Sequence, residues 1–413
     1  MRHQSFLTPR CKIFVDIYKS TEINSEKCIV CKGRLFCGLS KCPILAQIRV
    51  QKTVTLDREF FGPSPSLFVG WKNYPHVYYG PLSLPFEDEA EIYDNPKLWY
   101  GDGFNEIINY RSSLIRSMEK VRVDKESKIV EDVQEIVLSE KPVDIEVKLK
   151  KKPKFNILFS AISQPMGPMG KIEELKITEN PRISKKVDKV VNDDIKAENA
   201  LDILYKEGYD VYSLTRFLSS GVLGIEKKIV PTRWSITAVD DIIGKKLITE
   251  IKDFKIVDRY IVLSNSYLGN HFEILLIPKK WEFEILEAWI PNTFWTMGAE
   301  KINITSEYET YFGRKTYAIK QGGGYYAIRL GVLERLKELK RQACSLVFRE
   351  VTPDYFLPVG VWECRENVRN AEMNFFDTMK DALEYIKSKL STDFDLWKEK
   401  SVILNQETLE SFF

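Results

Sequence analysis

The stretch Val143-Asp-Ile-Glu-Val-Lys-Leu-Lys150 carries the clearest secondary-structure pattern in this chain. Aliphatic and charged residues alternate along it, and successive side chains of a strand point to opposite faces, so the pattern predicts a half-buried β-strand. The segment from Phe155 to Ile162 is mostly apolar and predicts an interior strand. This part of the chain is therefore expected to be β-structure.

Helical spacing follows further along the chain. Apolar residues recur at helical intervals from Asp194 to Lys206, and Gly208 suits the left-handed conformation that ends many helices. Asp210 is a suitable N-cap for a second short helix that ends at Gly221. The two segments predict a helical hairpin. A structural role is favoured over a DNA-binding helix-turn-helix, because most such pairs only pack.

The remaining elements have weaker signals. Aromatic, Gly and Pro residues from Phe60 to Arg116 predict long shaped loops with few regular elements. Strands are expected at 260–264, 272–277 and 281–289, as a meander, and at 302–311, 316–320, 346–351 and 360–363, with helices around 328–339 and 377–390. The expected fold class is α+β with several domains.

The length of 413 residues allows two or three domains. We expect an N-terminal segment with a metal-binding knuckle at 1–50 and a main α+β domain at 51–289. A smaller C-terminal α+β domain at 290–397 and a tail at 398–413 would follow.

The charge balance is nearly neutral. The 61 Lys and Arg almost cancel the 59 Asp and Glu, so the net charge of +2 means that any nucleic-acid contact must use a local patch. The residues from Met1 to Ser20 do not resemble a signal peptide, and no stretch reaches the roughly 18 apolar residues of a membrane span. We therefore expect a soluble, cytoplasmic protein without a membrane partner.

Four of the seven cysteines lie close together, at Cys28, Cys31, Cys37 and Cys42. In a reducing compartment this clustering favours a metal site over disulfides, and the spacing of Cys28 and Cys31 lets both thiolates reach one tetrahedral ion. Structural zinc is expected, because so short a segment depends on metal binding for its folding free energy. An iron–sulfur cluster is the alternative: Pro43 follows Cys42 as in ferredoxins, but the cysteine spacing matches neither common ferredoxin pattern.

The chain ends in Gln406-Glu-Thr-Leu-Glu-Ser-Phe-Phe413. A single 3₁₀ turn would place Leu409 and Phe412 on one face, with Phe413 beside them, as a compact apolar plug. Together with Gln406, these residues resemble the PCNA-interacting motif of replication and repair proteins at every diagnostic position. The PCNA sliding clamp is therefore the expected partner, which would hold the protein at the nucleoid. Docking of the two phenylalanines on the chain's own surface is the alternative.

A cysteine knuckle near the start and a clamp motif at the end resemble the archaeal Nre family of DNA repair proteins. The resemblance extends through internal segments and covers nearly the whole chain, with a large N-terminal and a smaller C-terminal family domain. These segments are Phe68-Val-Gly70 up to Tyr74-Pro75, Gly101-Asp-Gly-Phe104, Arg233-Trp-Ser-Ile-Thr-Ala-Val-Asp-Asp241 and Gly322-Gly-Gly324. Membership implies a role in the response to DNA damage and clamp binding through the four motif residues, but no particular reaction.

Asp240, Asp241, Glu250 and Lys252 are the candidates for catalysis. Metal-dependent nucleases gather carboxylates and a lysine around a divalent ion, and a strand would put Glu250 and Lys252 on one face. The segment from Asp241 to Ile251 fits a helix equally well, and such triplets arise by chance where Glu and Lys are common. A metal-dependent, structure-specific DNA nuclease is therefore the alternative to a DNA-binding factor, and a metalloprotein unrelated to DNA is a third possibility.

Two regions are candidates for DNA contact. A Gly-rich loop would open a helix whose N-terminus could hold a phosphate, with aromatic and basic residues beside it, and a run of lysines offers charge. The residues are Gly322, Gly323, Gly324, Tyr325, Tyr326 and Arg329, and Lys148, Lys150, Lys151, Lys152 and Lys154. A flexible hinge and solvated lysines are the alternatives. Nucleophilic catalysis is disfavoured, because His3, His76 and His271 have no nearby serine or cysteine in a recognisable order.

Overall fold

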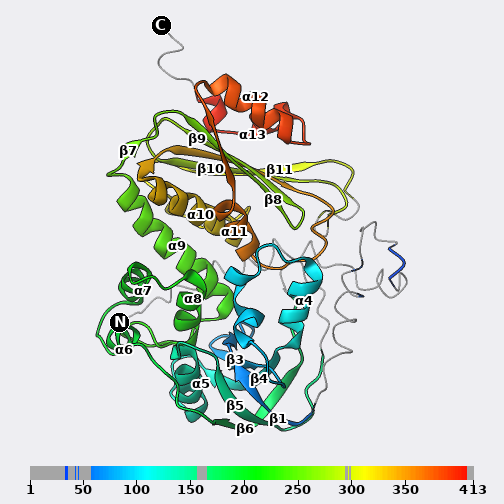
Figure 1. The fold of residues 1–413 in the computed structure, drawn as a ribbon, viewed down its shortest axis with the longest axis vertical. Coiled ribbons are helices and arrows are strands. Elements are labelled where there is room, and N and C mark those ends of the chain that lie inside the picture. Colours follow the sequence, from blue (N-terminus) through cyan, green and yellow to red (C-terminus); the bar gives the residue numbers. More distant parts are fainter. Residues whose placement is uncertain are drawn as a thin grey trace, which may run out of the picture.

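The structure is a computed structural model that describes residues 33–35, 42, 45, 57–155, 165–293, 296 and 299–406. This part of the chain forms two six-stranded sheets, a two-stranded ladder and a set of helices, which confirms the expected α+β class (Figure 1). None of the helices in these ranges is long and apolar enough to cross a membrane.

The first sheet has the strand order β1-β5-β6-β4-β3-β2. Its strands are β1 (Glu59–Ser64), β2 (Ser66–Val69), β3 (His76–Ser83), β4 (Ile115–Arg122), β5 (Val143–Leu149) and β6 (Met169–Ile177). Neighbouring strands are antiparallel, except that β4 and β6 are parallel. The stretch with period two forms β5, and its four aliphatic side chains are buried, so the predicted half-buried strand is confirmed.

The prediction of loops from Phe60 to Arg116 is wrong. This region holds β1, β2, β3, the 3₁₀ turns η2 (Ala90–Asp94) and η3 (Pro96–Leu98), and the helix α4 (Phe104–Ser113). Pro63 is tolerated because β1 is an edge strand. At Gly80 the pairing of β3 with β4 is interrupted, and a Cβ there would lie 1.9 Å from the Ser117 carbonyl oxygen. In this region a proline marks an edge strand and a glycine marks a close approach of two strands, so neither residue indicates a loop.

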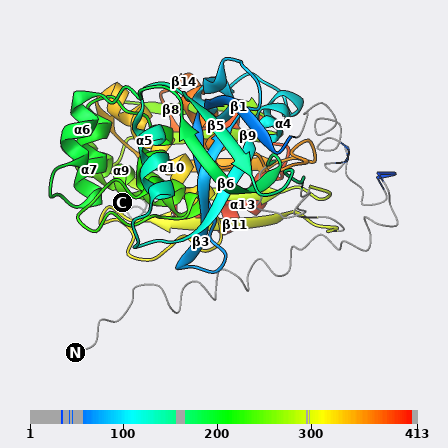
Figure 2. The same ribbon diagram turned by 90° about the horizontal axis from the view of Figure 1, so that it is seen from below.

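A helical layer packs against the first sheet. It contains α5 (Lys128–Leu138), α6 (Lys185–Val191), α7 (Ala197–Lys206), α8 (Val211–Ser220) and α9 (Thr232–Ile251). The predicted helical hairpin is confirmed as α7 and α8. The Asp210 side chain accepts hydrogen bonds from the backbone N–H groups of Tyr212 and Ser213 at 3.0 and 2.8 Å, and Gly208 and Gly221 have φ of +94° and +83°. Figure 2 shows α6 and α7 to one side of the first sheet and α4 to the other.

The second sheet has the order β11-β10-β13-β9-β8-β14. Its strands are β8 (Tyr260–Tyr267), β9 (Asn270–Ile277), β10 (Glu282–Trp289), β11 (Asn303–Glu309), β13 (Cys344–Val351) and β14 (Glu372–Phe376). The sheet thus takes strands from both sides of residue 290, where the sequence predicts a domain boundary. The short strands β7 (Lys255–Ile256) and β12 (Arg341–Gln342) form a separate parallel ladder.

Three details of this half differ from the prediction. The strands 260–289 do not form a meander, because β13 lies between β9 and β10 and runs parallel to β10. Parallel neighbours need a long crossover, which α10 (Gly323–Leu339) supplies. The segment 316–320 is not a strand, since the backbone N–H of Ala318 donates to Tyr326 Oη at 3.1 Å as the chain turns into α10. Trp362 begins the helix α11 (Trp362–Arg369) instead of a strand, because short apolar runs do not distinguish the two.

The two faces of the second sheet pack against different helices. One face joins α9, α10 and α11 in a core cluster that continues through the helical layer into the first sheet. The other face packs against α12 (Met379–Lys389), α13 (Phe394–Lys400) and the turn η4 (Ile403–Asn405), with Trp397 fully buried. Figure 1 shows α12 and α13 on the outer side of this sheet and α10 and α11 on its inner side. The predicted helices at 328–339 and 377–390 are confirmed.

Two predictions lie mainly outside the described residues. The interior strand expected from Phe155 to Ile162 falls in the range 156–164 except for its first residue. Of the four knuckle cysteines, only Cys42 is described. It is half-buried and forms no disulfide.

Candidate functional site

The clamp-binding motif begins where the described chain ends. Gln406 directly follows η4, and its Nε2 donates a hydrogen bond to Tyr308 Oη of β11 at 3.2 Å. Tyr308 in turn donates to Glu282 Oε2 at 2.9 Å. Leu409, Phe412 and Phe413 lie outside the described residues. The first motif residue therefore lies against the edge strand of the second sheet.

A buried carboxylate holds the chain in place just before the motif. Glu284 of β10 is fully buried and accepts hydrogen bonds from the backbone N–H groups of Val402 and Ile403 at 2.7 and 2.8 Å. It also accepts from the hydroxyls of Ser401 and Ser306 at 2.7 and 3.0 Å. The carboxylate of Glu284 thus links β10, β11 and the segment after α13. The point from which the tail leaves is fixed by these bonds.

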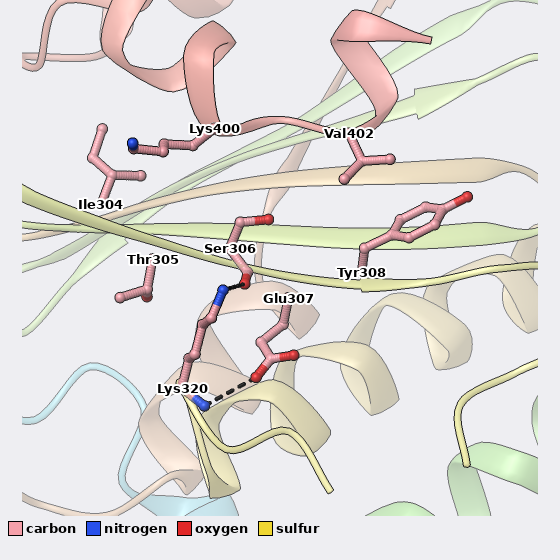
Figure 3. Close-up of a pocket in the computed structure, with 8 residues that line it drawn as sticks. All are labelled: Ile304, Thr305, Ser306, Glu307, Tyr308, Lys320, Lys400 and Val402. Carbon is pink, nitrogen blue, oxygen red and sulfur yellow. Dashed lines mark hydrogen bonds between the residues drawn. The ribbon is translucent and has the colours of Figure 1, made fainter. Parts of the chain in front are cut away.

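A hollow of about 560 Å³ opens beside this point (Figure 3). It is lined by the outer side of β11 together with two lysines and a valine: Ile304, Thr305, Ser306, Glu307, Tyr308, Lys320, Lys400 and Val402. Lys320 closes part of the strand edge, because its N–H donates to Glu307 Oε1 at 2.9 Å and its Nζ donates to the Ser306 carbonyl at 3.3 Å.

The candidate nuclease residues do not converge. Asp240 is buried and lies 2.5 Å from Arg365 Nη2 through both of its oxygens. Asp241 pairs with Arg329 at 2.7 Å and Lys245 at 2.6 Å. Glu250 pairs with Lys337 of α10 at 2.9 Å, while the Lys252 Nζ lies 4.3 Å from the centre of the Tyr311 ring.

The helical form of α9 explains this divergence. Glu250 lies in the last turn of α9 and Lys252 is its C-cap residue, so these two side chains do not share the face that a strand would give them, and Asp240 and Asp241 lie more than two turns earlier in the same helix. Burial raises the pKa of Asp240, and the charge of Arg365 opposes that effect. Among the described residues, no group of three or more His, Cys, Asp or Glu side chains could hold a metal ion. These carboxylates serve as ion-pair partners between helices.

The Gly-rich loop opens α10, but an internal carboxylate lies at that helix end. Gly322 has φ of +56°, and a Cβ at Gly324 would lie 3.6 Å from Glu287 Oε1. Arg349 pairs with the same Glu287 oxygen at 2.6 Å. Arg329 is only 1% exposed and is bonded to Glu309 at 2.6 Å as well as to Asp241. Tyr325 and Tyr326 are also buried, so this region offers no stacking surface.

The candidate lysines lie on the surface at one end of the first sheet. Lys148 pairs with Glu59 at 3.2 Å, and Lys152 pairs with Asp57 at 3.1 Å. Lys150, Lys151 and Lys154 are exposed.

One histidine contact is not predicted from the sequence. Ser266 Oγ lies 2.6 Å from Nδ1 of His271, because β8 and β9 form a hairpin in which these residues are opposite each other. The Nε2 atom of His271 lies 3.1 Å from the buried carboxylate of Glu273 but has no hydrogen bond of acceptable geometry. Ser264 Oγ donates to the same Glu273 oxygen at 2.6 Å. The group is therefore a cross-strand polar network and not an aligned nucleophile and base. The short turn at Leu268 and Gly269 was the sequence signal for it.

Two six-stranded sheets connected by a helical layer define a two-sheet α+β protein, in which ion pairs join α9 to α10 and α11. The chain belongs to the archaeal Nre family. The family profile described as "Archaeal Nre, N-terminal" matches residues 36–296, and the profile "Archaeal Nre, C-terminal" matches residues 309–412. The resemblance stated from the sequence is thereby confirmed.

Three curated relatives are similar over most of their length. The DNA repair protein NreB of Archaeoglobus fulgidus is 38% identical over 393 residues, which are 93% of this chain and 99% of the relative. The DNA repair protein NreA of the same organism is 39% identical over 399 residues, covering 94% and 99%. The DNA repair protein NreA of Haloferax volcanii is 36% identical over 382 residues, covering 88% and 90%. No solved structure matches the chain.

Proposed function

We propose that this protein is a DNA repair factor that the PCNA sliding clamp recruits to DNA through residues 406–413. The names of the relatives support the repair role. The position of Gln406 carries the clamp assignment: the chain is anchored through Glu284 up to Ile403, and the motif begins directly beyond that anchor. A tail that orders on binding is expected to have micromolar affinity for one clamp subunit.

Clamp binding should depend on the tail alone. Leu409→Ala should weaken binding to immobilised PCNA about tenfold or more, because this side chain would fill part of the clamp's apolar pocket. Removal of residues 407–413 should abolish binding without changing the unfolding midpoint. Leu396→Ala is the matched control, since Leu396 is a 43% exposed leucine on α13. Surface plasmon resonance measures both effects, and unchanged affinity after truncation would refute the assignment.

We further propose that Cys28, Cys31, Cys37 and Cys42 hold one structural zinc ion. Cys42 is half-buried and outside any disulfide, and Gly33 has φ of +82°, which suits a tight turn between ligand pairs. Elemental analysis should find about one zinc per chain, and Cys42→Ser should release it. Cys344→Ser, at a buried cysteine of β13, should retain the zinc. Iron with visible absorbance in place of zinc would favour the cluster alternative.

The nuclease alternative gains no support from the described residues. Each candidate carboxylate already has a cationic partner from its own helix, α10 or α11. The DNA repair role is therefore proposed without an assigned reaction.

A further inference from the structure

The turn that follows β11 presents an unusually exposed aromatic side chain. Phe312 is 90% exposed, far more than any other large hydrophobic residue of the described chain. The turn itself is well formed: the backbone N–H of Gly313 donates to the Thr310 carbonyl at 2.9 Å, and the N–H of Phe312 donates to Thr310 Oγ1 at 3.3 Å. A fixed turn that holds a phenylalanine in water has no packing role, because exposed apolar groups are unfavourable.

Two lysines lie close to the aromatic ring of Tyr311, the neighbour of Phe312. The rings of Tyr311 and Phe312 contact each other edge to face at 5.6 Å, and the Tyr311 ring lies 4.3 Å from Lys252 Nζ and 5.9 Å from Lys280 Nζ. Lys315 is exposed on the same turn. Within the described ranges, no salt bridge joins any of these three lysines to a carboxylate. Asp253, exposed beside Lys252, supplies one negative charge, and the three lysines outnumber it.

The turn also lies close to the tail along the same strand. Tyr308, which accepts the hydrogen bond from Gln406, is three residues before Tyr311. A span this short is at most about 10 Å of backbone. The proposed clamp tether and the exposed turn therefore leave the protein from one end of β11. A clamp that encircles DNA would therefore keep this turn near the encircled DNA.

We propose that Tyr311, Phe312, Lys252, Lys280 and Lys315 form a DNA-binding site for unpaired bases, here called the basic–aromatic turn. A base has an apolar face that can stack on Phe312, and the lysine ammonium groups can neutralise the flanking phosphates. In an intact duplex the base faces are already stacked, so the site selects single-stranded or locally opened DNA without sequence preference. This inference deepens the proposed repair function, on which it rests, by naming the DNA state that is recognised.

Fluorescence anisotropy with the full chain and no clamp tests the site. Phe312→Ala should weaken binding of a labelled mixed-sequence single strand about tenfold and change duplex binding little. Phe312→Trp should retain single-strand binding, because the stacking surface is kept. Phe375→Ala, at a 55% exposed phenylalanine of β14, is the matched control and should have no effect. Lys252→Gln and Lys280→Gln should each lower the slope of log affinity against log salt by about 0.7.

The outcomes separate this site from the clamp tether. Removal of residues 407–413 should leave single-strand binding unchanged, so failure of either proposal is visible without the other. If Phe312→Ala binds the single strand as tightly as the natural chain, the inference is overturned. It is also overturned if Phe312→Ala weakens binding to immobilised PCNA and leaves single-strand binding unchanged. The turn would then be a contact with the clamp and not with DNA.

Discussion

Asp240→Ala should lower the free energy of unfolding by about 3 to 5 kcal/mol, because it leaves the charge of Arg365 buried without a partner. Both oxygens of Asp240 lie 2.5 Å from Arg365 Nη2, and the two side chains are 1% and 2% exposed. Arg369 also lies close enough to repel Arg365. Urea denaturation followed by circular dichroism measures the loss.

A double variant separates the buried charge from the lost packing. Asp240→Leu combined with Arg365→Met should recover most of the stability, since an apolar pair of similar volume often replaces a buried ion pair at little cost. Asp202→Ala, which removes the surface pair with Lys206, should cost less than about 1 kcal/mol. Equal losses from Asp240→Ala and Asp202→Ala would show that the buried pair contributes no more than a surface one.

This effect bears on any search for nuclease activity. A loss of activity in Asp240→Ala would follow from unfolding as readily as from lost chemistry. Asp241→Ala is the better probe, because Arg329 keeps Glu309 as a partner at 2.6 Å. A functional assay should therefore compare Asp241→Ala with the natural chain at equal folded fraction.

Elements with a local physical cause could be predicted from the sequence. β5 follows from its alternation, and α8 follows from the Asp210 cap and from Gly221, which takes a positive φ. These signals act between residues a few positions apart, so they are readable in order along the chain.

Features that depend on distant partners could not be predicted. Asp240 and Arg365 are 125 residues apart, and no local pattern indicates that they meet. The placement of β13 between β9 and β10 likewise depends on how α10 packs. Arg329 looked available for DNA because its sequence neighbours are Gly and Tyr, yet its partner Glu309 comes from another strand.

The sequence of the proposed DNA site contains a pattern typical of a binding turn. Thr310-Tyr-Phe-Gly-Arg-Lys315 combines two aromatic residues, a turn glycine and two cations. The sequence predicts a strand up to Tyr311, and the side chains of such a strand are expected to be half-buried. Only the exposure of Phe312 distinguishes a binding turn from a packed one.

Glu363→Gln should remove a pH dependence of stability that the natural chain carries. Burial raises the pKa of Glu363 from 4.5 to about 7, although Arg349 opposes the shift from 3.9 Å. Arg349 is already paired with Glu287 at 2.6 Å, so one cation faces two carboxylates. Asn367 Nδ2 and Cys364 Sγ donate to Glu363 at 3.1 and 3.4 Å. These two hydrogen bonds also favour the ionised form, but burial outweighs them, so the group is held protonated over a range in which an unfolded glutamate ionises.

The sign of the effect follows from proton binding in the two states. Below pH 4.5 both states hold the proton, and between pH 4.5 and about 7 only the folded state does, so ionisation favours unfolding as the pH rises. A tenfold change in proton affinity is worth about 1.4 kcal/mol, so this residue should cost about 3 kcal/mol of stability across the window, with no further change above it. Glu363→Gln should lack that loss and be more stable than the natural chain near pH 8.

Other carboxylates also titrate, so the informative quantity is the difference between two pH profiles of unfolding free energy. Glu384→Gln, at an exposed glutamate of α12, should give a profile parallel to that of the natural chain. The Glu363→Gln profile should diverge from it as the pH rises from about 4.5 to about 7. If the two variants give the same profile, Glu363 is ionised in the folded protein, and the cation of Arg349 outweighs the burial of the carboxylate.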